Sequence, residues 1–126
     1  MTVLVDSDIL IEVLRGRDAG ILARWTELAE SADVVLCSPV SVAELWHGAR
    51  PKERGAVAAL FDALVCVPVD AATGRRTGDY LQRYAKSHAV ELGDALIAAA
   101  AAGENAALWT RNRKHYPMRG LEFYLS

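Results

Sequence analysis

The sequence lacks the long apolar segments that membrane-spanning proteins need. Its longest apolar run centres on the alanines at 98–102, far short of the roughly 20 residues that cross a bilayer. The first residues carry neither the basic segment nor the small-residue cleavage site of a secretory signal peptide. We therefore expect a cytoplasmic protein that makes no contact with a membrane.

Cysteine is also scarce, because Cys37 and Cys66 are the only two among the 126 residues. Two cysteines so far apart in the sequence do not form a zinc site. Each lies in an apolar, strand-like segment, which favours a buried free thiol, with a disulfide between the two as the alternative.

Several catalytic signatures are missing as well. The chain has no paired-histidine spacing for zinc, no glycine-rich phosphate loop and no Gly-x-Ser-x-Gly turn for a nucleophilic serine. Its histidines, His47, His88 and His115, are scattered, and for the first two we expect core or surface roles rather than metal binding.

An excess of positive charge is missing too, because 14 Lys and Arg face 16 Asp and Glu, a formal net charge of −2. The chain is therefore not a generally basic nucleic-acid binder. The basic residues fall into two groups. The first fits a solvated helix face as well as it fits RNA binding, and it consists of Arg75, Arg76, Arg83 and Lys86. The second falls in a loop beside a candidate site, and it consists of Arg111, Arg113, Lys114 and Arg119.

What the sequence does contain is typical of one folded domain over residues 1–126, with 52% hydrophobic and 24% charged residues. Short apolar runs alternate with segments of helical periodicity, which predicts a three-layer α/β/α sandwich around a mostly parallel sheet. Pro68 indicates that the third strand lies at an edge, and Asp70 is a suitable cap for the next helix. We expect strands at 2–5, 34–37, 65–69, 106–110 and 121–125, and helices at 7–15, 20–31, 38–48, 52–64, 70–86 and 93–102.

Acidic residues fall where such a sheet binds ligands, beyond the carboxyl ends of its strands. Asp6 ends the first strand, although a helix cap alone would explain it, with Ser7 and Asp8 as rivals for that position. Asp8 is better explained as a first-turn acid favoured by the helix dipole than as a ligand. Asp94 also suits a first turn, but its alanine-rich helix has no other charge until Glu104, which favours a paired or metal-binding group.

Glu44 has two explanations. Ser41 and Glu44 have the spacing of a capping box. Ser38 followed by Pro39 is a better helix start, which would place Glu44 inside the helix, where a carboxylate needs a cation or a donor. Together with Asp6 and Asp94, Glu44 predicts a site of oxygen ligands for a hard cation such as Mg²⁺, which would also relieve the repulsion between the acids.

The order and spacing of four segments resemble the PIN domain, specifically the VapC toxins of type II toxin–antitoxin pairs. Any one of these segments is a weak signal, but four in order over nearly the whole chain are fairly specific. They are Val3-Leu4-Val5-Asp6-Ser7-Asp8-Ile9-Leu10-Ile11, Ser41-Val42-Ala43-Glu44-Leu45, Leu92-Gly93-Asp94-Ala95-Leu96-Ile97-Ala98-Ala99-Ala100 and Leu108-Trp109-Thr110-Arg111-Asn112.

The resemblance implies an endoribonuclease that depends on Mg²⁺ or Mn²⁺, in which Asp6, Glu44 and Asp94 are the catalytic, metal-binding acids. Thr110 is then the supporting hydroxyl, with Ser7 in a similar role. Asn112 stands where many members carry a fourth acid, and an amide adds no charge, which puts a tightly held second metal in doubt. A metal-activated water would attack the phosphodiester in line, leaving 5′-phosphate and 3′-hydroxyl ends.

The same resemblance implies an RNA substrate, a VapB-like antitoxin and a homodimer. The basic loop supplies candidates for RNA phosphates in Arg111, Arg113 and Lys114, and His115 is a further candidate for a polar role there. For the antitoxin we expect a hydrophobic groove between early helices. An antitoxin Arg or Lys would reach the acids. Core packing is the alternative for its candidate lining residues, Ile21, Trp25, Leu28 and Trp46.

Two other classes remain open at this point. A receiver domain is also α/β with acids near its first strand, but Asp70 is a poor phosphoacceptor candidate and no lysine follows the last strand. A PIN-like scaffold without catalysis is the second alternative, and the presence of Asp6, Glu44 and Asp94 argues against it.

Overall fold

A four-stranded parallel sheet forms the centre of the protein in this computed structural model, which describes residues 1–125. The strands are β1 (Thr2–Val5), β2 (Val34–Cys37), β3 (Val65–Cys66) and β4 (Ala107–Trp109), in the order β3-β2-β1-β4. All three strand pairings are parallel, so β1 lies between β2 and β4 near the middle of the sheet. The predicted α/β class is confirmed.

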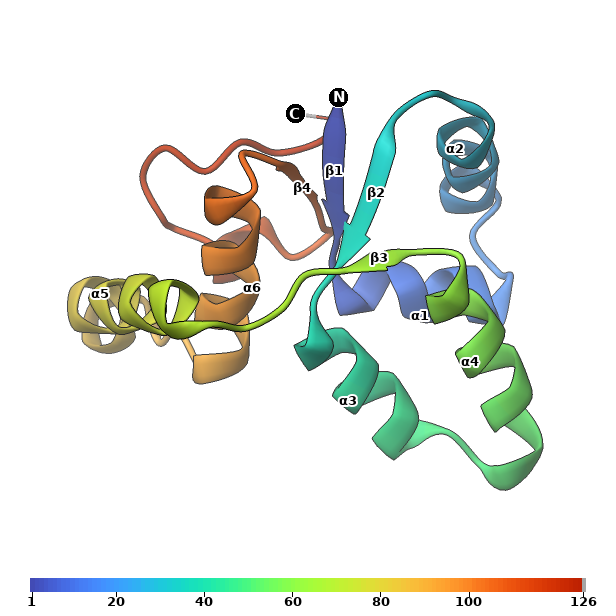
Figure 1. Cartoon of the computed structure of the whole chain (residues 1–126), viewed down its shortest axis with the longest axis horizontal. Coiled ribbons are helices and arrows are strands. Elements are labelled where there is room, and N and C mark those ends of the chain that lie inside the picture. Colours follow the sequence, from blue (N-terminus) through green and yellow to red (C-terminus); the bar gives the residue numbers. More distant parts are fainter. Residues whose placement is uncertain (126) are drawn as a thin grey trace.

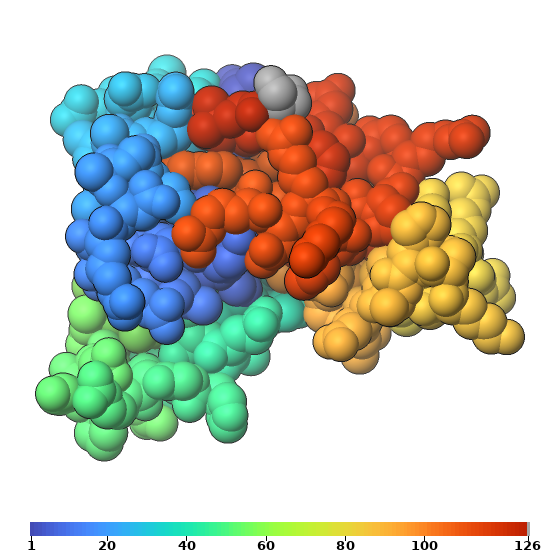
Figure 2. Space-filling model, turned by 180° about the vertical axis from the view of Figure 1, so that it is seen from behind, coloured from blue at the N-terminus to red at the C-terminus, as the bar shows by residue number. Residues whose placement is uncertain are grey.

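Helices cover both faces of this sheet, as the three-layer prediction requires (Figure 1). The longer elements are α1 (Ser7–Arg15), α2 (Ala19–Glu30), α3 (Pro39–Gly48), α4 (Arg54–Asp62), α5 (Ala71–His88) and α6 (Leu92–Gly103). Two 3-10 turns, η1 (Pro51–Glu53) and η2 (Arg113–His115), complete the described chain. From behind, residues after α6 spread over the middle of the molecule, between the N-terminal segment and α5 (Figure 2).

The alternation of side chains along β1 divides the core in two. Val3 and Val5 pack on one side with residues of α1, α2, α3 and α4, whereas Leu4 packs on the other with α5 and α6. Successive strand residues point to opposite faces, so a strand buried on both sides must be apolar throughout. The run from Val3 to Val5 is fully buried, which fixes the end of β1 in the centre of the molecule.

Several predicted boundaries need correction. The third strand covers only Val65–Cys66, and it lies at the sheet edge that Pro68 indicates. Residues 121–125 are not a strand, because their contact with the sheet is a single parallel bridge between Leu108 and Phe123. The helix expected at 52–64 is divided into η1 and α4. Asp70 caps α5 as expected, accepting a hydrogen bond from the Thr73 N–H at 2.9 Å.

The cysteines agree with the prediction only in part. Both are free thiols, as expected, but Cys37 is buried and Cys66 is exposed, because β3 is an edge strand. The two residues face each other in the register of β2 and β3. In the described part of the chain, no helix is long and apolar enough to cross a membrane.

Candidate functional site

Asp6 begins the site, directly after β1. Its carboxylate caps α1 by accepting the Ser7 N–H at 2.7 Å, and it also accepts the Thr110 hydroxyl at 2.8 Å. Thr110 follows β4, which pairs with β1, and its own oxygen accepts the Asn112 N–H at 3.0 Å. The carboxyl ends of these parallel strands therefore place Asp6, Thr110 and Asn112 side by side. Asp6 is both the helix cap and part of the site, so the two explanations do not exclude each other.

Glu44 reaches this site from α3. Ser38 caps that helix by accepting the Val40 N–H at 3.1 Å, with Pro39 in the first turn, so the capping box of Ser41 and Glu44 is excluded. The Ser7 hydroxyl donates to Glu44 Oε1 at 3.0 Å and lies 2.7 Å from the Ser41 hydroxyl. Since a hydroxyl donates only once, Ser41 is then the donor to Ser7. Glu44 itself is exposed rather than enclosed by apolar residues as predicted.

Asp94 comes from the first turn of α6 and is partly buried. The Nδ1 atom of His115 lies 3.9 Å from its Oδ2. One cavity of about 300 Å³ brings the predicted acids, Ser7 and Asn112 together, although they are distant in sequence. Its walls are Asp6, Ser7, Asp8, Ile11, Glu44, Ala89, Glu91, Asp94, Ile97, Asn112 and His115.

Burial and mutual repulsion act on the acids of this cavity. Burial raises the pKa of Asp6, the charge of Asp94 adds to the effect, and the hydrogen bonds from Thr110 and Ser7 oppose it. Burial likewise raises the pKa of Asp94, helped by Glu91 and Glu44 and opposed by His115. The site therefore favours either proton uptake or a bound cation over bare negative charge.

Asp8 is a site residue that sequence reasoning missed. Its Oδ2 accepts the Arg111 N–H at 3.0 Å, while its Oδ1 is buried and has no hydrogen-bond partner among residues 1–125. Burial, and then the charge of Asp6, raise the pKa of Asp8. Its place in the first turn after β1 was the available signal, because that turn lies at the same sheet edge as Asp6. Glu91, at the cap of α6, also lines the cavity and was not predicted.

The basic loop is largely engaged with the protein itself. Arg111 pairs with Asp8 at 3.6 Å and with Glu12 at 3.5 Å. Arg113 lies over the Phe123 ring at 4.9 Å and donates to the Leu125 carbonyl at 2.9 Å. All three residues are exposed, but the contacts of Arg111 and Arg113 leave Lys114 as the most available of the three predicted phosphate contacts.

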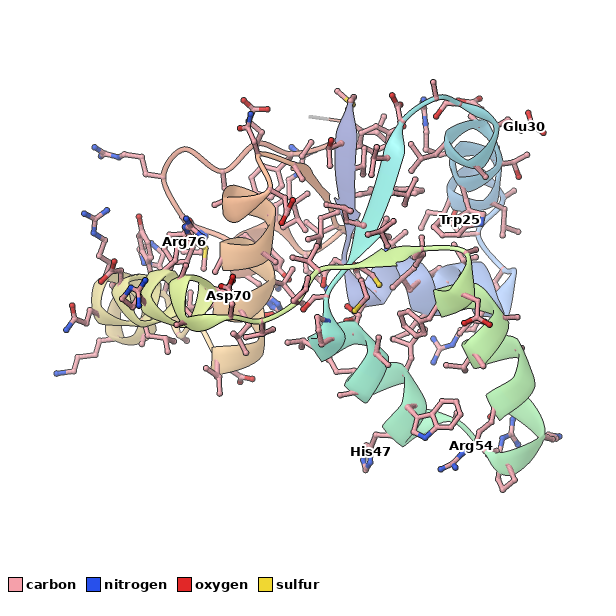
Figure 3. The ribbon with its side chains drawn as sticks, viewed as in Figure 1. Trp25, Glu30, His47, Arg54, Asp70 and Arg76 are labelled. Carbon is pink, nitrogen blue, oxygen red and sulfur yellow. The ribbon has the colours of Figure 1, made fainter. Side chains whose placement is uncertain are left out.

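The apolar stripe predicted for the antitoxin is mostly core. Ile21 and Leu28 are only 9% and 2% exposed, so they offer no surface to a partner, because α2 packs this stripe against the sheet. Trp25 is partly buried against the same core (Figure 3). Trp46 is 38% exposed, with the Arg54 guanidinium 4.6 Å from its ring centre.

The donors suit a hydrated cation better than an enclosed one. Among residues 1–125, no three His, Cys, Asp or Glu side chains come close enough to hold a metal by themselves. Mg²⁺ commonly keeps several waters and uses one or two carboxylates, so a compact cage is not needed. The Asp8 Oδ1 atom has no hydrogen-bond partner among residues 1–125, and the raised pKa values of Asp6 and Asp94 show that their negative charges are poorly compensated. A bound cation would compensate these charges. The oxygen donors present therefore fit a hard divalent cation.

Comparison with known sequences decides the family. The sequence model described as "PIN domain" matches residues 3–121. The chain belongs to the PIN domain family. Within it, the chain is 42% identical to "Ribonuclease VapC10" of Mycobacterium tuberculosis over 117 residues, which are 92% of this chain and 86% of that protein. It is 34% identical to "Ribonuclease VapC19" of the same organism, over 91% of this chain and 92% of that one.

Solved structures support the PIN fold independently. The chain matches VapBC2 from Rickettsia felis bound to a promoter DNA fragment with a TM-score of 0.82 and 21% identity, over 98% of both chains. It matches DNA-bound VapBC from Salmonella typhimurium with a TM-score of 0.83 and 18% identity, over 98% of this chain and 97% of that one. The predicted family, fold and enzyme class, a PIN-domain ribonuclease of the VapC type, are thus confirmed, and a receiver domain is excluded.

Proposed function

We propose that this PIN domain is an Mg²⁺-dependent endoribonuclease that serves as the toxin of a toxin–antitoxin pair, with the whole chain forming one domain in the cytoplasm. One observation carries the proposal: Asp6, Glu44 and Asp94, from three different elements, line a single cavity. The names of the relatives, ribonucleases VapC10 and VapC19, support the same activity.

The carboxylates of Asp6, Glu44 and Asp94 would hold the cation together with its water ligands, because they do not come close enough to enclose it by themselves. Asp6 is the buried ligand and Asp94 the partly buried one, and the exposed Glu44 faces them from α3. Mg²⁺, or Mn²⁺ in its place, supplies a Lewis acid that neutralises phosphoryl charge and makes water easier to deprotonate. Thr110 and Ser7 orient the Asp6 carboxylate, and Ser7 also holds Glu44, so the ligands are positioned before RNA arrives.

Asn112 in the cavity and the basic residues of the loop beside it complete the site. Asn112 offers an amide oxygen without charge, so the second cation position is weak. Lys114 binds a flanking phosphate as an exposed cation, and Arg111 and Arg113 contribute only where RNA displaces their present partners. Cleavage by attack of water on phosphorus leaves 5′-phosphate and 3′-hydroxyl ends.

The antitoxin surface lies next to the acids rather than along α2. A groove of about 490 Å³ runs between α1, α3 and α4, and it shares Ile11 and Glu44 with the acidic cavity. An amphipathic VapB-like segment would cover the apolar wall that includes Leu14 and Leu45, and a basic residue on it would reach the acids. Similarity to the VapBC structures supports such a partner, and we propose a homodimer for the toxin itself.

A cleavage assay with matched variants tests this function. Purified protein should cut RNA with Mg²⁺ or Mn²⁺ and stop when a chelator is added. Asp94→Asn should abolish cleavage while the fold persists, whereas Glu104→Gln, an exposed acid at the other end of α6, should change nothing. Undiminished cleavage by Asp94→Asn, or full activity in chelator, would refute the proposal, and a scaffold would show no cleavage at all.

A further inference from the structure

The basic side chains of this protein differ in whether they have an acidic partner. Three cations of the N-terminal half form ion pairs with an acid three residues away, and they are Arg15, Arg24 and Arg50. Near the end of α5 and after η2 lie three exposed cations, Arg83, Lys86 and Arg119, which we call the basic surface. Among residues 1–125, no carboxylate lies within ion-pair distance of these three side chains. Their charges are therefore available to a partner.

One hydrogen bond links the two parts of the basic surface. The Arg119 N–H donates to the Tyr84 hydroxyl at 3.2 Å, and Tyr84 directly follows Arg83 on α5. The Tyr84 ring packs against the core, so its hydroxyl is a fixed point for the segment that carries Arg119. From behind, the end of α5 and the segment after η2 lie side by side at one end of the molecule (Figure 2). The three cations are thus brought to the same end of the protein.

The basic surface begins close to the acidic cavity. Helix α5 ends at His88, and the next residue, Ala89, lines the cavity. Lys86 precedes Ala89 by three residues, which is a rise of about 5 Å along a helix. On the other side, His115 lines the cavity and Arg119 follows it by four residues. Both segments therefore lead from the cavity onto the basic surface.

Helix electrostatics explain only part of this arrangement. Lys86 is in the last turn of α5, where the helix dipole favours a cation. Arg83 lies before that turn and Arg119 belongs to no helix, so the dipole does not account for them. Asp79, an exposed acid one turn before Arg83, marks the limit of the basic surface along α5. The stability of α5 therefore does not require the three cations together.

The acidic cavity by itself repels the substrate of a ribonuclease. Asp6, Glu44 and Asp94 line the cavity, and the whole chain has a net charge of −2. An RNA strand is a polyanion, so cations beside the cavity are needed to attract it. The basic residue that an antitoxin would direct at the acids gains nothing from a basic surface. Charge complementarity therefore favours RNA phosphates as its occupant.

We propose that Arg83, Lys86 and Arg119 bind phosphates of the RNA strand that flanks the cleaved bond. The inference rests on the proposed function and adds to it the path of the substrate outside the cavity. Contacts with phosphates position a strand and carry no direct information on its bases. The basic surface therefore acts on RNA affinity, whereas the acids of the cavity act on the bond.

The test compares two double variants that each remove two positive charges. One is Arg83→Gln with Lys86→Gln, and the matched control is Arg17→Gln with Arg24→Gln, beside and on α2 and away from the cavity. Affinity for a fluorescein-labelled single-stranded RNA is measured by anisotropy in chelator at several salt concentrations. The values of kcat and KM are measured with Mg²⁺, and melting temperatures show that each variant is folded.

The basic-surface variant should bind RNA about tenfold more weakly at low salt, and its log–log salt slope should be smaller by about 1.4, since each single-strand phosphate contact contributes about 0.7. Its KM should rise while kcat at saturating RNA is unchanged. Arg119→Gln should cause a smaller change of the same kind. The control double variant should match the wild type in affinity, salt slope and KM.

Three results would overturn the inference while the proposed function stands. The first is wild-type affinity, salt slope and KM in the basic-surface variant. The second is an equal loss in both double variants, because overall charge rather than this surface would then attract RNA. The third is normal RNA binding with lost antitoxin affinity, which would assign the surface to the antitoxin. A wild type that neither binds nor cuts RNA would refute the proposed function itself, and the inference with it.

Discussion

The Thr110 hydroxyl holds Asp6 through a 2.8 Å hydrogen bond that joins the ends of two neighbouring strands, β4 and β1. Thr110→Val keeps the shape of the side chain and removes this donor from a buried carboxylate. We expect a loss of about 1–3 kcal/mol of unfolding free energy at neutral pH, together with a large fall in RNA cleavage. Denaturant titration and a cleavage assay measure the two effects. Thr110→Ser should restore most of both, and a failure of Ser to do so would show that the methyl group matters instead.

Acidification should relieve the unfavourable contribution that three buried or partly buried acids make to the stability of the protein in chelator, whereas Glu53 and Asp70, whose pKa values are lowered, act in the opposite direction. Burial raises the pKa values of Asp6, Asp8 and Asp94 above 3.8, so the folded state holds protons that the unfolded chain has released. Their unfavourable contribution therefore diminishes as pH falls from neutrality through the raised pKa values, and it levels off below the unfolded value of 3.8.

Asp94→Asn isolates one of these groups. The variant should melt higher than the wild type at pH 7 without metal, and the difference should shrink as the pH approaches 4. Melting curves in chelator at several pH values give the comparison. If the difference in melting temperature stayed constant across this pH range, the pKa of Asp94 would not be raised by its surroundings, contrary to expectation.

Asn112→Asp should strengthen metal binding. Asn112 lines the acidic cavity, and a carboxylate there would add a charged oxygen donor. We expect half-maximal cleavage at a lower Mg²⁺ concentration with the fold unchanged. An unaltered Mg²⁺ titration would place this side chain outside the reach of the cation.

The groove between α1, α3 and α4 predicts which substitutions release the antitoxin. Leu14 lines the groove and is 37% exposed, so Leu14→Glu should weaken antitoxin binding while RNA cleavage by the free protein persists. Val69→Glu, at an exposed apolar residue outside the groove, serves as the control. Trp25→Ala should mainly lower the melting temperature, because the ring packs on the core. Lost antitoxin affinity in a stably folded Trp25→Ala would instead restore the surface predicted on α2.

The two cysteines should differ in reactivity. Burial, and then the neighbouring Cys66, raise the pKa of the Cys37 thiol to about 12, so Cys37 is almost never the reactive thiolate. A thiol reagent should modify one cysteine in the native protein and two after denaturation. Cys66→Ser should leave no reactive thiol in the native state, and rapid labelling of that variant would contradict the burial of Cys37.

The sequence was sufficient to predict the features that depend on local pattern. The unbroken apolar run Val3–Val5 ending in Asp6 determines a buried strand and a carboxylate at its end. Ser38 and Pro39 determine where α3 starts, which excludes the capping-box explanation of Glu44. These residues act through their nearest neighbours in the chain, and so a single sequence reveals them.

Features that depend on distant partners were missed. Asp8 is the first-turn acid of α1 that the sequence predicts, but its contact with Arg111, 103 residues away, and its place in the cavity were not predicted. The stripe of α2 has the same periodicity whether it faces the sheet or a partner, and only the packed structure shows that Ile21 and Leu28 face inward. Residues 121–125 have the composition of a strand, but pairing beside β4 extends to one bridge only.

The shortness of β1 has an evolutionary consequence. The strand has only four residues, of which Val3 to Val5 are buried, and its pairing with β2 and β4 places Asp6 directly beyond its carboxyl end. Deleting one of the four residues would exchange the two faces of the strand and withdraw the carboxylate from Thr110. We therefore expect insertions and deletions among nucleases with this fold to be rare in β1 and to occur in exposed connections that carry no site residue.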